Sequence, residues 1–190
     1  MAEPRAFVCG HPIAHSRSPA IHRHWLRHYG LAGSYEAIDV APDRAPAFFR
    51  GLVHSGLAGG NVTLPHKETA FSCVDRRDDE AEAVGAVNTL WIDGDRLCGG
   101  NTDVHGFLAN LDDRAPGWDS RETALVLGAG GAARAVVRGL VKRGFDVTIA
   151  NRTDARAGEL AARFGTRAIA WADRNRIAAA SDLVVNTTPL

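Results

Sequence analysis

Short apolar segments alternate with amphipathic helical segments along most of the chain. The expected strands cover 6–10, 35–40, 59–63, 88–92, 95–99, 123–128, 146–150, 167–171 and 182–186. The expected helices cover 18–29, 45–53, 103–111, 131–143 and 154–164, and a further helix begins at Pro65. Because this alternation is typical of parallel sheets covered by helices, the sequence predicts an α/β fold.

Turn and cap residues mark several of the expected boundaries. Ser18-Pro19 predicts a helix start capped by the serine hydroxyl, and Gly30 predicts the end of that helix. Asp93-Gly94, between two apolar runs, predicts a hairpin with a type I′ turn. The charged run 75–82 predicts a solvated helix face or a loop.

A polar segment with Pro and Gly, 112–120, separates the two halves of the chain. We place a domain boundary there, which gives an α/β domain over 1–112 and a Rossmann-type nucleotide-binding domain over 113–190. The last apolar run, 182–186, would leave the edge of an open parallel sheet unpaired. We therefore expect the second domain to be truncated and the chain to be part of a longer protein.

Composition excludes some classes of partner and favours a cytoplasmic location. The formal net charge of the 190 residues is +0, which gives no electrostatic reason to expect nucleic acid or an anionic membrane as a partner. No apolar run approaches the roughly 20 residues that span a bilayer, and the N-terminus lacks a signal-peptide pattern. Cys9, Cys73 and Cys98 are widely spaced and odd in number, which indicates a reducing compartment without a disulfide framework.

A glycine-rich loop follows the strand expected over 123–128 and opens a helix. In the pattern Gly128-x-Gly130-x-x-Ala133, the first glycine permits a tight turn and the second allows backbone to approach a pyrophosphate. The helix N-terminus favours the negative charge. The candidate dinucleotide-binding residues are Gly128, Ala129, Gly130, Gly131 and Ala132. A glycine-rich turn that serves packing alone is the alternative.

The end of the next strand indicates which dinucleotide binds. An NAD site usually has Asp or Glu about 20 residues beyond the glycines, to bind the ribose 2′-hydroxyl. Here the strand ends in Asn151, Arg152 and Thr153, and Arg156 follows one turn later. Guanidinium and hydroxyl groups suit a 2′-phosphate, so the sequence favours NADP over NAD.

Lys67 lies in the first turn of the helix expected to begin at Pro65. A cation is disfavoured there, because the helix N-terminus already carries partial positive charge. A surface lysine is one interpretation, and a lysine that exchanges a proton with a substrate is the other.

Six segments in the same order resemble the shikimate 5-dehydrogenase family over essentially the whole chain. They are HSRSP (15–19), NVTLPHK (61–67), AVNT (86–89), GGNTDVHGF (99–107), GAGGAARA (128–135) and NRT (151–153). The resemblance implies two α/β domains with the active site in the cleft between them. It also implies reversible, NADPH-dependent reduction of 3-dehydroshikimate to shikimate, in the pathway to the aromatic amino acids. Monomers and homodimers are both compatible with it.

The resemblance also assigns substrate-site residues. Ser16 and Ser18 match the hydroxyl pair that holds the substrate carboxylate. Lys67 and Asp103 match the catalytic pair at the reacting oxygen, and the residues leave open which of them accepts the proton. The remaining matches are Asn61, Thr63 and Asn88, whose side chains suit a polyol.

The chain departs from the family pattern at a few positions. His66 stands where many relatives have Phe, Gly100 where many have a larger residue, and Arg23 where Asn is common. The family also continues beyond this chain with further strands and a helix that returns to the first domain and brings a glutamine to the substrate. We expect Asn101 and Thr102 to shape the backbone around Asp103.

Other functions remain as alternatives. An NAD-dependent quinate/shikimate dehydrogenase, an aminoshikimate-type enzyme and a non-catalytic ligand sensor could use the same scaffold. His22, His24 and His28 share one expected helix, but only the last two have i, i+4 spacing and no third ligand is evident, so we expect no metal site. His15, beside the serine pair, lines the substrate pocket or stabilises a turn.

Overall fold

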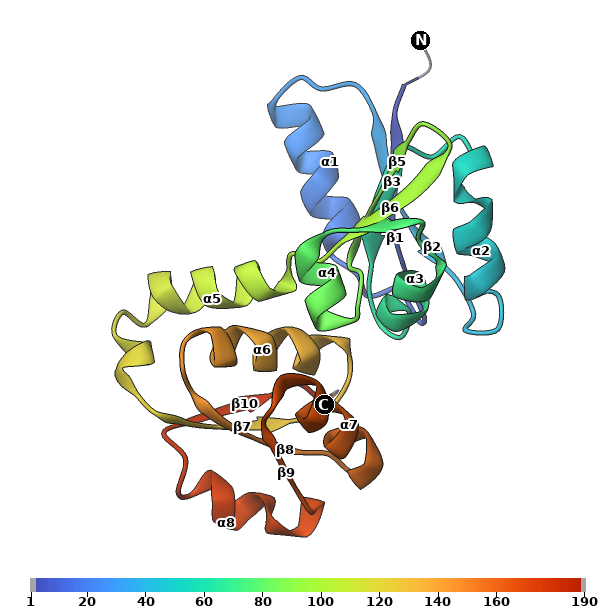
Figure 1. Ribbon diagram of the computed structural model, residues 1–190. Helices are drawn as coiled ribbons and strands as arrows, with labels where there is room; N and C mark the ends of the chain where they lie inside the picture. Colours follow the sequence, from blue (N-terminus) through green and yellow to red (C-terminus); the bar gives the residue numbers. More distant parts are fainter. Residues whose placement is uncertain (1–2, 189–190) are drawn as a thin grey trace. The chain divides into compact units, whose positions relative to one another are not determined.

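The computed structural model describes residues 3–188. It divides into two compact units, Met1–Asn101 and Thr102–Leu190, and each combines a sheet with covering helices (Figure 1). The predicted α/β class is therefore confirmed. Within residues 3–188, none of the helices has the length and apolar character needed to cross a bilayer.

The first unit is built on a six-stranded mixed sheet with the order β2-β1-β3-β5-β6-β4. Its strands are β1 (Arg5–Gly10), β2 (Ser34–Asp39), β3 (Gly59–Val62), β4 (Arg76–Arg77), β5 (Thr89–Asp93) and β6 (Arg96–Gly100). Strands β2, β1 and β3 are parallel, whereas β5 is antiparallel to both β3 and β6. The carboxyl ends of the three parallel strands consequently meet at one edge of the sheet.

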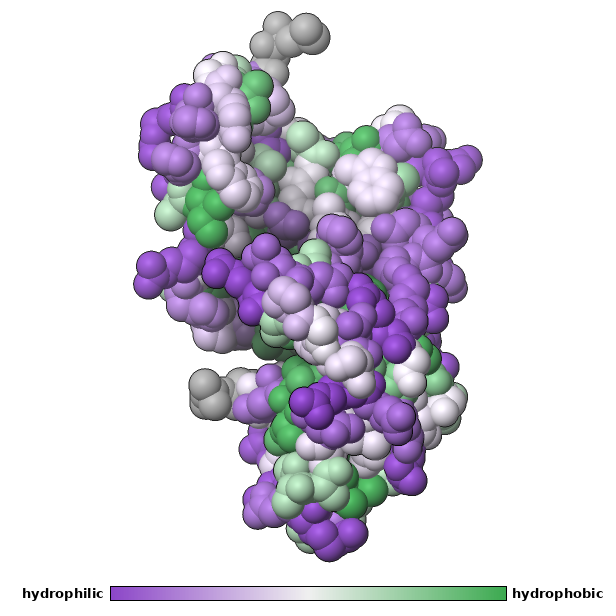
Figure 2. All heavy atoms as spheres, turned by 90° about the vertical axis from the view of Figure 1, so that its left-hand side faces the viewer, coloured by the Kyte–Doolittle hydropathy of each residue, from purple (hydrophilic) through white to green (hydrophobic). Residues whose placement is uncertain are grey.

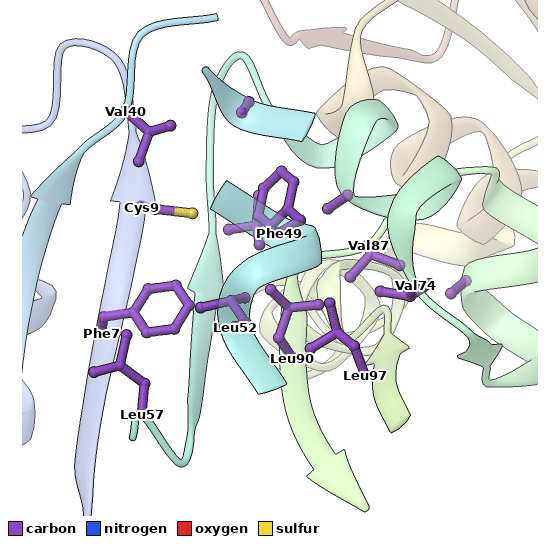
Figure 3. Packing of buried hydrophobic residues seen from close by; sticks show 14 residues of the cluster. Phe7, Cys9, Val40, Phe49, Leu52, Leu57, Val74, Val87, Leu90 and Leu97 are labelled. Carbon is purple, nitrogen blue, oxygen red and sulfur yellow. The ribbon is translucent and has the colours of Figure 1, made fainter. Parts of the chain in front are cut away.

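Helices cover the two faces of this sheet unequally. They are α1 (Ser18–His28), α2 (Ala45–Gly51), α3 (Lys67–Cys73) and α4 (Asp79–Val84), and a 3₁₀ helix, Leu52–His54, extends α2. Because side chains alternate along β1, Phe7 and Cys9 enter the main core with Phe49 of α2 (Figure 3). Val8 points to the opposite face, where it packs with Ile13 and Tyr35.

Helix α1 is amphipathic, as expected, but the apolar side chains along one of its faces are only partly buried by the rest of the described structure. Ile21, Trp25 and Tyr29 keep 45%, 49% and 67% of their surface exposed. In the view that faces this side of Figure 1, apolar side chains lie among polar ones on the surface (Figure 2). The stripe on α1 is therefore mostly solvent-facing, and the part of the helix that contacts the sheet is the face carrying His22 and Arg23.

The second unit contains a four-stranded parallel sheet with the order β10-β7-β8-β9. Its elements are α5 (Asp103–Arg114), β7 (Thr123–Leu127), α6 (Gly131–Lys142), β8 (Asp146–Ala150), α7 (Asp154–Phe164), β9 (Arg167–Ile169), α8 (Arg174–Ala178) and β10 (Leu183–Asn186). Val126, Val137, Leu140 and Ile149 are fully buried between the sheet and its helices. Helix α8 was not predicted, because its five residues are too few to show a helical period.

Helix α5 belongs to the compact unit that holds the glycine-rich loop. Gly139 of α6 lies so close to α5 that an added Cβ would be 3.2 Å from Phe107 and 3.3 Å from Leu108. The division at Asn101 and Thr102 thus precedes the polar segment where the sequence places the boundary. The function of 1–112 and 113–190 as separate domains stays a prediction.

Two local predictions in the first unit need correction. The hairpin of β5 and β6 is confirmed, but Asp93 pairs with Arg96, so the loop is Gly94-Asp95. Gly94 has φ +64°, and among the described residues only glycines have positive φ. A type I′ turn needs positive φ at both loop residues, so that prediction is wrong and the φ signs are those of a type II′ turn.

The charged run 75–82 contains a strand as well as a helix. Arg76 and Arg77 pair with β6, and two charged residues give no strand pattern in the sequence. Asp78 caps α4 by accepting a hydrogen bond from the Ala81 N–H at 2.6 Å. The run is therefore only partly solvated, since Ala81 is fully buried.

Candidate functional site

The loops that follow β1, β2 and β3 are bonded to one another at the carboxyl edge of the first sheet. The Val40 N–H donates to the Gly10 carbonyl at 3.1 Å, and the Thr63 N–H donates to the Cys9 carbonyl at 2.9 Å. The His11 N–H donates to the Leu64 carbonyl at 3.0 Å. These bonds fix the starting points of the segments that carry the serine pair and Lys67.

Gly10 permits the closest approach between these loops. A Cβ at position 10 would lie 2.6 Å from Thr63 Cγ2 and 2.7 Å from the Leu64 carbonyl oxygen. Both distances are below any normal contact, so a side chain at this position would displace the Thr63 loop. Glycine is therefore required here by space.

The segment from His11 to Ser18 is held by Asp39 at the end of β2. The Asp39 carboxylate accepts from His11 Nδ1 at 2.6 Å and from the Ile13 N–H at 3.2 Å. These two hydrogen bonds, with the bond from His11 the stronger cause, lower the pKa of Asp39 below its ordinary value. The Ser16 N–H in turn donates to the Ile13 carbonyl at 2.9 Å, so Asp39 anchors the loop that leads to the serines.

Ser16 and Ser18 lie together at the start of α1, and both are half-buried. The Ser18 N–H donates to Ser16 Oγ at 3.3 Å. Ser18 was expected to cap the helix, but Arg17 occupies the N-cap position and Ser18 is the first helical residue. The correction has a simple cause: the hydroxyl of Ser16, two residues earlier, already accepts the Ser18 N–H.

Lys67 is the first residue of α3, so it lies in the first turn of the helix as expected. Pro65 lies before the helix and not at its first position, because a turn closed by the His66 N–H and the Thr63 carbonyl, 2.9 Å, precedes it. The His66 side chain, only 1% exposed, donates from Nε2 to the Val40 carbonyl at 2.6 Å. The Val87 N–H donates to the Lys67 carbonyl at 2.9 Å, so the backbone of Lys67 is held by the segment before β5.

Asn61 and Asn88 are joined by side chains that the sequence did not single out. Asn61 and Thr89 are paired across β3 and β5, and Thr89 Oγ1 donates to Asn88 Oδ1 at 2.8 Å. Tyr35 donates from its hydroxyl to Asn61 Oδ1 at 2.7 Å. Cross-strand register creates this group, and register cannot be read from one sequence; the only signal was that Thr89 follows Asn88 directly.

Asp103 begins α5 in the second unit, whereas Lys67 and the serine pair lie in the first. The pairing of Lys67 with Asp103 therefore stays a prediction. Before Asp103, Asn101 is buried and donates from Nδ2 to the Ala86 carbonyl at 2.9 Å, a backbone-shaping bond of the kind expected for it.

The glycine-rich loop has the backbone expected of a strand-to-helix turn. Gly128 has φ +114°, a conformation that favours glycine. Gly130 has φ −92°, and a Cβ there would meet no atom within 4 Å. Within the described residues, neither backbone strain nor packing therefore requires glycine at position 130. The space beside its backbone is open, as the binding of a pyrophosphate there would need. No side chain caps the first turn of α6 in this part of the structure, as is true of most of the described helices.

The end of β8 places the predicted 2′-phosphate residues on one turn. Asn151 Nδ2 donates to the Thr153 carbonyl at 2.9 Å and so shapes the turn that leads into α7. Arg152 and Thr153 are exposed on this turn, and Arg156 is exposed in the first turn of α7 that follows it. Asp154 is the first residue of α7, as expected, and is accordingly used at a helix start.

The remaining candidates lie outside these sites. Within residues 3–188, no group of three or more His, Cys, Asp or Glu side chains could hold a metal ion. His24 and His28 stack on each other on α1, with ring centroids 5.9 Å apart, and His15 is exposed. The three cysteines are free, and burial raises the pKa of Cys9 to about 12, which keeps its thiol protonated.

Comparison with known families gives two matches that together cover most of the chain. Residues 8–90 match the shikimate dehydrogenase substrate binding domain. Residues 114–189 match the shikimate / quinate 5-dehydrogenase family.

Individual relatives agree with these matches. Shikimate dehydrogenase (NADP(+)) of Mesorhizobium japonicum is 57% identical over all of this chain and 69% of its own length. The same-named protein of Brucella abortus is 54% identical over 98% of this chain and 65% of its own length. The structure of shikimate 5-dehydrogenase from Thermus thermophilus in complex with NADP(H) and shikimate superposes with a TM-score of 0.84, at 42% identity over 97% of this chain and 68% of that one. This chain thus spans about two thirds of the length of these relatives, and it belongs to the shikimate dehydrogenase family.

Proposed function

We propose that this protein catalyses the reversible reduction of 3-dehydroshikimate to shikimate with NADPH, a step in aromatic amino-acid biosynthesis. The observation that carries the proposal is the gathering of hydroxyl, amide and ammonium side chains on one edge of the first sheet. Ser16 and Thr63 lie on the loops that follow β1 and β3 there, and Ser18 and Lys67 begin the helices to which these loops lead. Family membership supplies the identity of the substrate.

The substrate groups have chemically matched partners on this edge. The hydroxyls of Ser16 and Ser18 bind the carboxylate, and they do so without adding charge. Asn61, Thr63 and Asn88 bind the ring hydroxyls, because amide and hydroxyl groups can both donate and accept. The Asp39 and His66 bonds described above preorganise the two loops, which lowers the ordering cost of binding.

Lys67 and Asp103 handle the proton. Oxidation of an alcohol removes a proton from the oxygen as the carbon gives up a hydride, and reduction returns both. Lys67 begins α3 and carries an amine that can give up and take back a proton. Asp103 begins α5 and carries a carboxylate that can do the same, and the family resemblance assigns the two to the reacting oxygen.

NADP fits the second unit. When bound, NADP would supply the hydride-transfer chemistry that this reaction needs. The open position beside Gly130 and the uncapped first turn of α6 would hold the pyrophosphate. Arg152, Thr153 and Arg156 would hold the 2′-phosphate, and no carboxylate precedes Asp154 at the end of β8 to favour NAD.

We further propose that the protein works in the cytoplasm as a monomer or homodimer, with no nucleic acid or membrane partner. The free cysteines support a reducing compartment. The neutral net charge gives no general attraction to polyanions.

The test is a matrix of initial rates in the oxidation direction. NADPH or NADH formation is measured with shikimate or quinate, and with NADP⁺ or NAD⁺. We expect turnover with shikimate and NADP⁺. Arg152→Ala should raise the KM for NADP⁺ without changing kcat, whereas Arg163→Ala, later on α7, should change neither.

Two outcomes would redirect the proposal. Turnover only with quinate and NAD⁺ would replace both the substrate and the cofactor proposed here. Thermal stabilisation by shikimate without any turnover would assign the chain to ligand binding and would contradict catalysis by this chain.

A further inference from the structure

Tyr35 places a hydroxyl group inside the first unit at a predicted substrate-binding residue. Its side chain is only 4% exposed and packs with Val8 of β1 and Ile13. From β2 it reaches Asn61 on β3, two strands away in the sheet, and donates to Asn61 Oδ1 at 2.7 Å. A buried hydroxyl that spans a strand to reach one amide indicates a specific bond.

Helix α1 fixes Tyr35 from both ends. The His22 imidazole stacks on the Tyr35 ring, with centroids 4.0 Å apart and planes 4° from parallel. Arg23 donates from Nε to the Tyr35 carbonyl at 3.0 Å. Burial first, and the nearby Cys9 thiol second, raise the pKa of Tyr35 to about 12, so its hydroxyl remains a proton donor at neutral pH.

Hydrogen bonds at both ends of the Asn61 amide determine which way it points. The other end of the amide faces the Asn88 carbonyl at 3.4 Å and Thr89 Oγ1 at 3.5 Å. A carbonyl oxygen only accepts, so the amide nitrogen must lie on that side and the oxygen on the side of Tyr35. The 3.4 and 3.5 Å contacts are long for hydrogen bonds, so the Asn88 carbonyl selects the orientation, and the short bond from Tyr35 holds the amide in that position.

Thr89 extends the same chain of bonds to Asn88. Its hydroxyl donates to Asn88 Oδ1 at 2.8 Å, and Asn88 is 8% exposed. The side-chain oxygens of Asn61 and Asn88 thus each accept a hydrogen bond from a hydroxyl group that is not itself a predicted substrate-binding group.

We infer that Tyr35 is a positioning residue: clamped by His22 and Arg23 of α1, it holds the Asn61 amide so that its NH₂ group, not its oxygen, meets a hydroxyl of the bound substrate. The inference rests on the proposed function and adds a specificity element to it. Without this bond the amide loses the shortest of its hydrogen bonds and is free to move away from the position in which its NH₂ group meets the substrate.

The test is a double-mutant cycle on shikimate affinity, measured by calorimetry on the full chain. Tyr35→Phe keeps the stacked ring and removes only the hydroxyl. Tyr29→Phe is the matched control, because Tyr29 is the only other tyrosine and is 67% exposed. We expect Tyr35→Phe to weaken binding about three- to tenfold, Tyr29→Phe to leave it unchanged, and Tyr35→Phe to add no loss in an Asn61→Ala background.

Two results would overturn the inference, and a pair of Thr89 variants would support it further. Equal affinity of Tyr35→Phe and the unmodified chain overturns it, and so does an undiminished loss in the Asn61→Ala background, which would mean general loosening. Thr89→Val should weaken binding as well, and Thr89→Ser, which keeps the hydroxyl, should restore it.

A failure of the proposed function can be distinguished from a failure of this inference. If the unmodified chain does not bind shikimate, the proposed function fails, and the orientation is then read from the side-chain amide NMR signals of Asn61. A shift of those signals in Tyr35→Phe, absent in Tyr29→Phe, supports the positioning bond. Unchanged signals in both variants overturn it.

Discussion

Individual residues determine how the loops at the carboxyl edge of the first sheet are held, two through side-chain bonds to backbone atoms and one through the lack of a side chain. His66 bonds the Val40 carbonyl, Asp39 bonds the Ile13 N–H, and Gly10 makes room for Thr63. None of these three residues is itself a candidate binding residue, but each supports a loop that leads to one or carries one. Their effect on function is therefore expected to pass through loop position.

His66→Phe is the first prediction at this scale. Phenylalanine keeps the contact with Phe49, whose ring centroid lies 6.4 Å away, but leaves the buried Val40 carbonyl without the imidazole donor. We expect the free energy of unfolding to fall by about 1–2 kcal/mol, measured by urea denaturation. Unchanged stability would mean that the bond from His66 contributes nothing to the fold.

Gly10→Ala tests the space beside Thr63. The added methyl would overlap Thr63 Cγ2 and the Leu64 carbonyl, so we expect a loss of about 1–3 kcal/mol in unfolding free energy. Gly51→Ala is the control, because a Cβ there meets nothing within 4 Å, and it should leave stability unchanged or raise it slightly. Equal effects of the two substitutions would contradict the steric account.

At the scale of elements, the loop before α6 separates structural glycine from ligand-related glycine. Gly128→Ala forces a side chain into φ +114° and toward Thr187, so it should lower the melting temperature. Gly130→Ala has open space and ordinary φ, so the fold should tolerate it while NADP⁺ affinity falls. Thermal unfolding with and without NADP⁺ measures both effects, and equal NADP⁺ affinity for Gly130→Ala and the unmodified chain would argue against pyrophosphate at this loop.

The loop over 11–18 gives a pH prediction. The bonds from His11 and Ile13 lower the pKa of Asp39 in the folded state, so this carboxylate contributes stability above its ordinary pKa of 3.8. That contribution is lost as pH falls through the lower folded-state value. We expect the unfolding free energy of the unmodified chain to decline in this acid range, and the decline to be smaller in Asp39→Asn. Identical pH profiles for the two proteins would exclude Asp39 as an anchor of the loop.

Most elements could be predicted from the sequence because their signals are local. The apolar runs at 6–10 and 123–128 became β1 and β7, and the glycine pattern opened α6 as expected. Arg76 and Arg77 form a strand that depends only on pairing with β6, and helix α8 is too short to show a period. Such elements are set by their neighbours and leave no pattern of their own.

Across the whole molecule, the candidate site could be predicted only as far as motifs reach. Ser16, Lys67, Asn61 and Asn88 stand in recognisable segments, whereas Tyr35 enters through cross-strand geometry that no single segment encodes. The family matches extend over 8–90 and 114–189, so both halves carry the family's sequence signal. The proposed chemistry needs both halves, since Lys67 and Asp103 belong to different compact units.

The most direct test of the central claim is the rate of shikimate oxidation by NADP⁺ in Lys67→Ala. Lys142→Ala is the control, because Lys142 is the chain's only other lysine and lies at the end of α6. We predict that Lys67→Ala lowers kcat by about 10²–10⁴-fold while shikimate still stabilises the fold, and that Lys142→Ala behaves like the unmodified chain. A Lys67→Ala protein that turns over shikimate at the unmodified rate would contradict the account, since the proton would then be handled elsewhere.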